Sequence, residues 1–219
     1  MTEIGPNDTV YFLGDAIDRG PDGWEILKEL LNDPRIIFIK GNHEDMMSNA
    51  LMKYPKLSAW SSAMSQWSWN GYEPTIFAIE QANQDEVKEI LKKVRNLPTH
   101  AIYKNPNGDI FWLCHAGCDY GIDMDYIANY DLIWDRSHYI SNAWYDGPDN
   151  VYIVHGHTPI SYLVKELNKY HKDIPKATKG AYYYAEGHKI CIDCGAHFTN
   201  TTVLLNLDTF EEKVFTIDE

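Results

Sequence analysis

Acidic, amide and histidine side chains follow the ends of several apolar segments in this 219-residue chain. Four of them are Asp15, Asn42, His115 and His157. Carboxylate, amide and imidazole groups together are donors that suit Mn, Fe or Zn better than Ca. Asp18, Arg19 and His43 lie beside them in the sequence. Such residues suit an anionic substrate whose leaving group needs a proton.

Each of these side chains also has a purely structural interpretation when it is taken alone. Asp18 and Arg19 could form a surface ion pair in a turn, and such pairs contribute little stability. Asn42 could stabilise a turn through its own side chain. His115 could bond a backbone carbonyl, and His157 could cap the turn at the following Pro. Their common position after strands of one α/β chain favours the functional interpretation, because ligands in α/β proteins bind beyond the carboxyl ends of strands.

The segments that precede these residues read as buried strands, since they are nearly continuous in apolar and β-branched residues. They cover residues 9–13, 35–40, 110–114, 151–154 and 189–192. The last of them is followed by Asp193, a fifth polar strand end. Two further strands at 202–207 and 213–217 are predicted to form a hairpin.

Helices are predicted between the early strands. Asp22 is expected to cap a helix that begins at Gly23, and Asp85 a second helix with an apolar stripe. Residues 45–98 contain no clear strand and are interpreted as a helical excursion that covers one end of the sheet. The alternation of strand and helix predicts an α/β protein with a single domain over residues 1–219.

Composition limits the classes of function. The net charge is −13, which argues against nucleic acid or an anionic membrane as the main partner. No apolar run reaches the ~18 residues of a membrane span, and the first ten residues lack a signal-peptide pattern. Four cysteines in a chain of this length favour a reduced state. We therefore expect a cytoplasmic globular protein.

Several motifs together resemble the phosphoprotein phosphatase branch of the calcineurin-like metallophosphoesterases, and most closely its short bacterial serine/threonine protein phosphatases. The two most specific strings are Gly-Asp-Ala-Ile-Asp-Arg-Gly at 14–20 and Gly-Asn-His-Glu at 41–44. Weaker matches are His-Ala-Gly at 115–117, Gly-His-Thr at 156–158, Trp-Asp-Arg at 134–136, Asn-Gly at 70–71 with Thr75, and Ile-Asp-Cys-Gly-Ala at 192–196. The resemblance implies a β-sandwich of two central sheets flanked by helices.

The resemblance also implies a role for each matched residue. Its metal ligands would be Asp15, bridging two ions, with Asn42, His115 and His157. Its catalytic residues would be His43 as proton donor, Asp18 orienting it, and Arg19 and Arg136 binding the phosphoryl oxygens. The cofactor would be a divalent metal, Mn first, with Fe or Zn as alternatives. The reaction would be attack by a metal-bridging hydroxide on a phosphomonoester.

One family motif has no counterpart here. The family opens with a strand that ends in Gly-Asp-x-His-Gly, and this sequence contains no Asp-x-His. Either the natural protein is longer or this is a divergent member; we favour truncation, because the later motifs are intact. In both cases we expect one incomplete metal site and weak or no activity. The missing central strand would leave a sheet edge open to a second copy of the chain.

Three functions remain open at this point. The first is a serine/threonine protein phosphatase acting on phosphoproteins or small phosphoesters, the second a symmetrical diadenosine tetraphosphate hydrolase, and the third a non-catalytic phosphate-binding protein. Of the remaining residues, Glu44 is interpreted as a helix cap, His155 as a core residue and the tryptophans Trp60, Trp67 and Trp69 as packing. The Cys191-x-x-Cys194 pair is interpreted as strand-borne thiols rather than a redox or zinc site.

Overall fold

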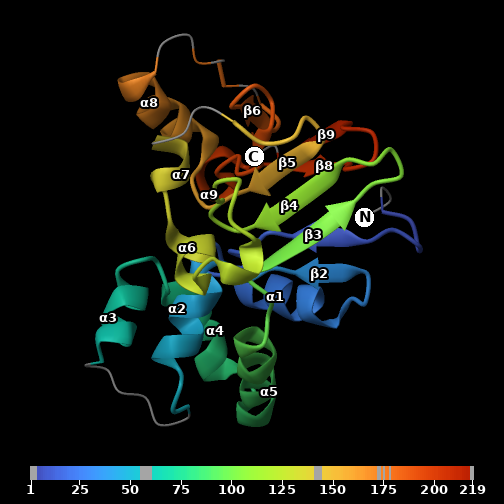
Figure 1. Cartoon of the computed structure of the whole chain (residues 1–219). Helices are drawn as coiled ribbons and strands as arrows, with labels where there is room; N and C mark the ends of the chain where they lie inside the picture. Colours follow the sequence, from blue (N-terminus) through green and yellow to red (C-terminus); the bar gives the residue numbers. More distant parts are fainter. Residues whose placement is uncertain are drawn as a thin grey trace. The chain divides into compact units, whose positions relative to one another are not determined.

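The computed structural model describes residues 4–54, 61–140, 145–171, 174, 176–177 and 179–217, with the side chains of residues 139 and 140 excepted. The chain divides into two compact units, Met1–Pro98 and Thr99–Glu219. Both units combine helices and strands, which confirms the predicted α/β class (Figure 1). The single domain over residues 1–219 stays a prediction. In the described part of the chain, no helix combines the length and apolar character needed to cross a bilayer.

The first unit contains a short parallel sheet and five helices. Its elements are β1 (Val10–Phe12), α1 (Gly23–Asn32), β2 (Ile36–Phe38), α2 (Asn42–Ala50), α3 (Ser62–Ser68), α4 (Glu73–Gln81) and α5 (Gln84–Arg95). β1 pairs with β2 in parallel, so α1 is the crossover that parallel pairing requires. The rings of Phe12 and Phe38 pack edge to face at the end of this sheet, with centroids 5.0 Å apart.

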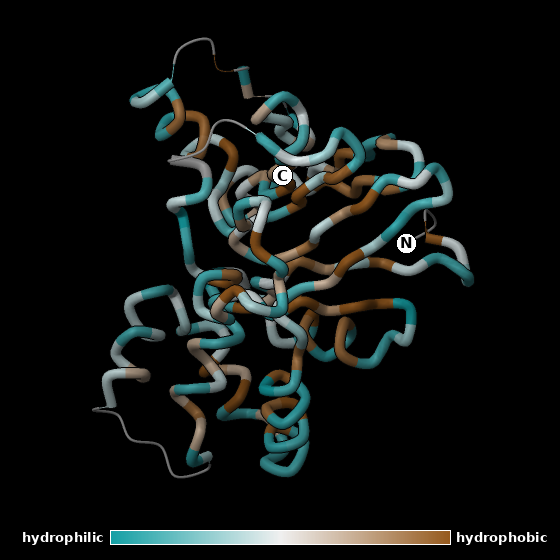
Figure 2. The backbone as a smooth tube through the Cα atoms, viewed as in Figure 1, coloured by the Kyte–Doolittle hydropathy of each residue, from teal (hydrophilic) through white to brown (hydrophobic). Residues whose placement is uncertain are grey.

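The helical excursion is confirmed where the chain is described, since residues 45–98 contain α2–α5 and no strand. The apolar stripe predicted for α5 is also confirmed: Val87, Ile90, Leu91 and Val94 are buried. Figure 2 shows brown and teal residues on different sides of this helix. The predicted cap was wrong. α5 begins two residues earlier than predicted, at Gln84, and Asn83 accepts hydrogen bonds from the backbone N–H groups of residues 85 and 86.

The second unit is built on a mixed five-stranded sheet in the order β3-β4-β5-β7-β6 and a separate hairpin, β8-β9. Its strands are β3 (His100–Lys104), β4 (Ile110–Cys114), β5 (Val151–His155), β6 (Tyr182–Tyr184), β7 (Lys189–Cys191), β8 (Thr201–Leu205) and β9 (Glu212–Thr216). Its helices are η1 (Met124–Tyr126), α6 (Asn129–Trp134), α7 (Ser137–Ile140), α8 (Ile160–Tyr170) and α9 (Ala196–Thr199).

The three central strands β4, β5 and β7 run parallel, and their register places their carboxyl ends at one edge of the sheet. Phe111, Leu113, Ile153 and Ile190 are at most 1% exposed, as expected for strands covered on both faces. All three strands and the hairpin were predicted. The two outer strands β3 and β6, which pair antiparallel to their neighbours, were not.

Candidate functional site

The loop after β1 presents its polar residues from an unusual backbone. Asp15, Asp18 and Arg19 have φ values of 62°, 72° and 63°, in the left-handed region that non-glycine residues rarely adopt. Each such residue costs on the order of 1–3 kcal/mol and persists only where the surroundings enforce it. These three strained residues are among those that the sequence predicts to be functional, and strained backbone of this kind clusters at functional sites.

Glu44 holds this loop in place. Its carboxylate accepts hydrogen bonds from the backbone N–H groups of Asp15 and Ala16, both at 2.8 Å, and of Gly41 at 3.0 Å. The side chain is buried, with 0% exposure. The capping role predicted for Glu44 is confirmed, because the bond to Gly41 completes the capping box of α2. The two further bonds join the loops that follow β1 and β2.

Gly41 lets these two loops approach. A Cβ atom on Gly41 would lie 2.4 Å from Asp15 Oδ1 and 2.5 Å from the Asp15 nitrogen. We expect Gly41→Ala to displace Asp15 and to destabilise the protein by about 1–3 kcal/mol, the cost of overpacking. Urea unfolding measures this change. Gly20→Ala is the control, because a Cβ at Gly20 meets nothing within 4 Å; equal stability of the two variants would contradict the close approach.

Asp18 and His43 form a buried pair. The His43 Nδ1 atom lies 2.6 Å from Asp18 Oδ2, and the two residues are 2% and 7% exposed. Burial acts to lower the pKa of His43, but the hydrogen bond to Asp18 and the charges of Asp15 and Asp18 outweigh it, so the pKa of His43 is raised. Because Nδ1 faces the carboxylate, Nε2 is the nitrogen left to exchange a proton with a ligand.

The first turn of α2 also contacts the Asp15 side chain through its backbone. The His43 backbone N–H donates to Asp15 Oδ1 at 3.1 Å. Asn42, the first residue of α2, is 5% exposed. The first unit therefore places His43 against Asp18 and its backbone N–H against Asp15, with Asn42 next to it in the chain, and the roles of these residues stay predictions.

Arg19 is fixed through its backbone and leaves its side chain exposed. Its backbone N–H donates to the Gly71 carbonyl at 2.8 Å. Gly71 has φ of 88°, and a Cβ there would lie 2.9 Å from Arg19 Cγ. The Asn70-Gly71 segment thus supports Arg19 at a position where only glycine fits well.

Asp18 has two further partners that the sequence did not reveal. Trp67 Nε1 donates to Asp18 Oδ2 at 2.9 Å, and Thr75 Oγ1 donates to Asp18 Oδ1 at 2.7 Å. Trp67 was interpreted as packing, and it is indeed 0% exposed. The packing interpretation was incomplete, because a buried indole N–H needs an acceptor and here it has a carboxylate. Trp69, two residues later, is 89% exposed, so packing was wrong for that residue; Trp60 lies outside the described residues.

In the second unit, His115 follows β4 and His157 follows β5. His115 Nε2 lies 3.1 Å from His157 Nδ1, and the residues are 1% and 8% exposed. His157 has φ of 65°, another left-handed residue at a predicted ligand. Two nitrogens that each bind one cation at about 2.0–2.1 Å lie roughly 3.0–3.4 Å apart. The two imidazoles therefore fit a shared divalent metal ion.

Arg136 is held near these histidines by a hydrogen bond to the residue after His157. Its Nε donates to Thr158 Oγ1 at 3.0 Å, and Thr158 directly follows His157. The Arg136 side chain is otherwise exposed, so part of its guanidinium faces solvent. In the second unit, the predicted site residues His115, His157 and Arg136 are thus connected. Asp193 lies close to Gly156, and its Oδ1 accepts the backbone N–H of Gly195.

His155 belongs to a buried polar network, which confirms its interpretation as a core residue. Its Nε2 lies 2.8 Å from the Tyr184 hydroxyl, which lies 3.3 Å from His138 Nε2. Burial lowers the pKa of His155 to about 3 and that of His138 well below its ordinary value. Both imidazoles are therefore neutral and structural. The four cysteines are free, and Cys191 is fully buried on β7.

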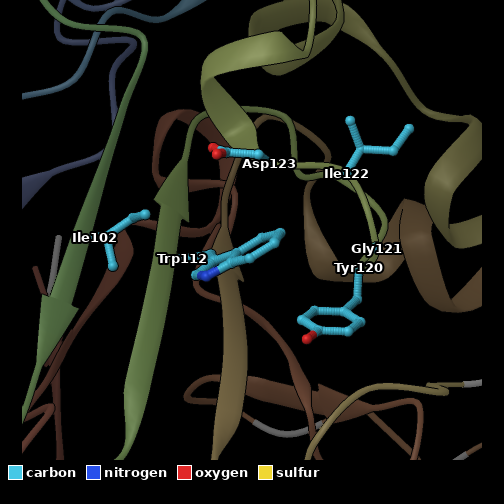
Figure 3. A pocket seen from close by; sticks show the side chains of 6 residues that line it. All are labelled: Ile102, Trp112, Tyr120, Gly121, Ile122 and Asp123. Carbon is cyan, nitrogen blue, oxygen red and sulfur yellow. The ribbon is translucent and has the colours of Figure 1, made fainter.

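The described pockets contain none of the predicted site residues. One, of about 360 Å³, lies against the sheet of the second unit and is lined by Ile102, Trp112, Tyr120, Gly121, Ile122 and Asp123. Figure 3 shows Trp112 at its centre, with Ile102 on the neighbouring strand and Asp123 at the rim. The other, of about 290 Å³, is lined by Ser65, Gln66, Trp69 and Asn70. Apolar hollows of this kind are distinct from the polar strand ends.

Comparison with known proteins identifies the family. The family model described as calcineurin-like phosphoesterase matches residues 2–193, and the chain therefore belongs to this family. The chain is 30% identical over 130 residues to serine/threonine-protein phosphatase 2 of Escherichia coli (strain K12). That match covers 58% of this chain and 54% of the relative, so the chain spans about half the length of the curated relative.

A solved structure supports the fold. The crystal structure of a protein provisionally described as a diadenosine tetraphosphatase superposes with a TM-score of 0.59, at 14% sequence identity, over 95% of this chain and 80% of that chain. The predicted metallophosphoesterase fold is thereby confirmed. Membership of the family supports hydrolysis of phosphoesters with a divalent metal.

Proposed function

We propose that this protein is a metal-dependent phosphomonoester hydrolase that acts on phosphoserine or phosphothreonine in proteins. The observation that carries the proposal is the buried His43–Asp18 pair, with a 2.6 Å hydrogen bond, beside the exposed Arg19. An oriented imidazole next to a guanidinium suits a substrate that is anionic and must lose an alkoxide. The identity to a serine/threonine-protein phosphatase favours this substrate class.

We assign the metal to four side chains from the polar strand ends. Asp15 and Asn42 would supply oxygen atoms, and His115 and His157 nitrogen atoms. Mn²⁺ is the proposed ion, because this mixture of oxygen and imidazole donors suits it. When bound, such an ion supplies Lewis acidity toward the phosphoryl group and lowers the pKa of water that it binds.

The chain's own residues perform the remaining tasks. Arg19 and Arg136 would bind phosphoryl oxygens, for which the planar guanidinium is well suited. His43 Nε2 would give its proton to the leaving oxygen as the P–O bond breaks, so that the serine or threonine leaves as a neutral alcohol. Asp18 accepts a hydrogen bond from the Nδ1–H group of His43 and stabilises the charged imidazole before the proton is transferred.

The cytoplasmic location and a second copy of the chain as partner also stay predictions.

The proposal is tested by phosphate release from a phosphoserine peptide with Mn²⁺ present. We expect weak turnover, because one metal site is incomplete, and we expect Asp15→Asn to lower it by more than the about 10- to 100-fold that loss of an outer partner of a metal site costs. Asp22→Asn is the matched control, because Asp22 is exposed and caps α1 without a side-chain bond. If the protein hydrolysed diadenosine tetraphosphate and not the phosphopeptide, the proposed substrate class would be wrong and the diadenosine tetraphosphate hydrolase would take its place. Mn²⁺ binding without turnover of either compound would favour the non-catalytic alternative.

A further inference from the structure

The Asp18 carboxylate is bonded from three directions. Oδ2 accepts from His43 Nδ1 at 2.6 Å and from Trp67 Nε1 at 2.9 Å, and Oδ1 accepts from Thr75 Oγ1 at 2.7 Å. Trp67 and Thr75 are 0% and 1% exposed, and the Asp18 side chain is 0% exposed. A carboxylate in water would rotate freely about its last bond; here both oxygens are engaged by protein donors.

The two additional donors differ in what they fix. Thr75 bonds Asp18 twice, since its hydroxyl donates to the carboxylate and also accepts the Asp18 backbone N–H at 2.9 Å. This pair of bonds holds the left-handed backbone of Asp18, whose φ is 72°. Trp67 shares oxygen Oδ2 with His43. A second donor on this oxygen fixes its direction toward the His43 imidazole.

Both donors come from the helical excursion. Trp67 lies on α3 and Thr75 on α4, whereas Asp18 follows β1 and His43 opens α2. The Trp67 ring is itself held, because it packs edge to face on Tyr72 with centroids 5.3 Å apart. The helical excursion is therefore more than a cover, since it supplies rigid donors to the proton-transfer pair.

We propose that Trp67 and Thr75 are positioning residues for the leaving-group proton donor: they hold Asp18 so that His43 presents Nε2 to the substrate. The inference rests on the proposed function of His43. In the step concerned, the P–O bond breaks, the Nε2 proton passes to the leaving oxygen, and His43 becomes neutral. It regains a proton from the water molecule whose oxygen ends on the phosphate.

Leaving-group dependence tests this role. Phenyl phosphate needs protonation of its leaving oxygen more than p-nitrophenyl phosphate does, because nitrophenoxide is the weaker base. We expect Trp67→Phe, which removes the N–H and keeps a ring, to lower kcat for phenyl phosphate about tenfold, the effect of one lost hydrogen bond to a charged group. The decrease with p-nitrophenyl phosphate is expected to be smaller, and KM to stay unchanged. Trp69→Phe, at the exposed neighbouring tryptophan, is expected to change neither.

A second readout needs no turnover. A proton in a 2.6 Å bond between an imidazole and a carboxylate gives a proton NMR signal far downfield of the amide region. We expect this signal in the unmodified chain, its loss in Asp18→Asn, and a shift or faster exchange in Trp67→Phe and Thr75→Val. Thr75→Ser, which keeps the hydroxyl, is expected to restore the original position.

The outcomes separate this inference from the function on which it rests. If Trp67→Phe lowers both substrates equally and leaves the downfield signal in place, Trp67 only packs and the inference is overturned. If His43→Ala itself shows no leaving-group dependence, the proposed role of His43 fails instead. A chain that hydrolyses neither substrate still tests positioning through the NMR signal, and an unchanged signal in both Trp67→Phe and Thr75→Val would refute it.

Discussion

His43→Ala is expected to lower kcat for a phosphoserine peptide by about 10²- to 10⁴-fold, the range in which a positioned general acid contributes. The side chain is 2% exposed and bonded to a carboxylate, so no solvent group can take its place. KM is expected to change little, because proton donation matters in the transition state rather than in the ground state. Initial rates with Mn²⁺ at saturating peptide measure the effect.

Two controls accompany the prediction for His43→Ala. His197→Ala, at an exposed histidine of the second unit, is expected to retain full activity. Folding of His43→Ala is checked by its urea midpoint, since the loss of one buried polar side chain also changes stability. A correctly folded His43→Ala protein with more than a tenth of the normal kcat would show that another group protonates the leaving oxygen.

The strands that support the site were predictable because they are buried on both faces. The segments predicted at 110–114, 151–154 and 189–192, which correspond to β4, β5 and β7, are largely apolar, and each is followed at once by a polar residue. β3 and β6 escaped prediction for physical reasons. β3 alternates half-buried and exposed residues after a proline, and β6 consists of three tyrosines, a composition that fits a loop as well as a strand. Outer antiparallel strands give this weaker signal because one face meets solvent.

The motifs that predict site residues are local in the sequence, but the contacts that support these residues are not. Asp15, Asn42 and His43 occur in motifs, and the first unit places them together. The roles of Trp67 and Thr75 depend on bonds to a residue about 50 positions earlier, and no local pattern encodes such a bond. Likewise, the sequence indicated the role of Glu44 in capping α2, but it did not indicate the hydrogen bonds from Glu44 to the loop after β1.

Glu44→Ala is expected to destabilise the first unit strongly. It would leave the backbone N–H groups of Asp15, Ala16 and Gly41 without their carboxylate acceptor, inside a site where Glu44 is 0% exposed. An orphaned buried donor costs about 1–3 kcal/mol, so three give a loss on the order of 3–5 kcal/mol after partial relaxation or entry of water. Urea unfolding, extrapolated to water, measures this loss.

The size of this effect depends on geometry rather than on charge alone. Glu44→Gln keeps one acceptor oxygen but turns an NH₂ group toward the backbone donors, so we expect it to be nearly as destabilising as alanine. Glu80→Ala removes a carboxylate from the exposed face of α4 and is expected to change stability by less than about 0.5 kcal/mol. If Glu44→Gln instead matched the unmodified chain, the loops after β1 and β2 would be held by other contacts. The left-handed conformation of Asp15 would then need a different cause.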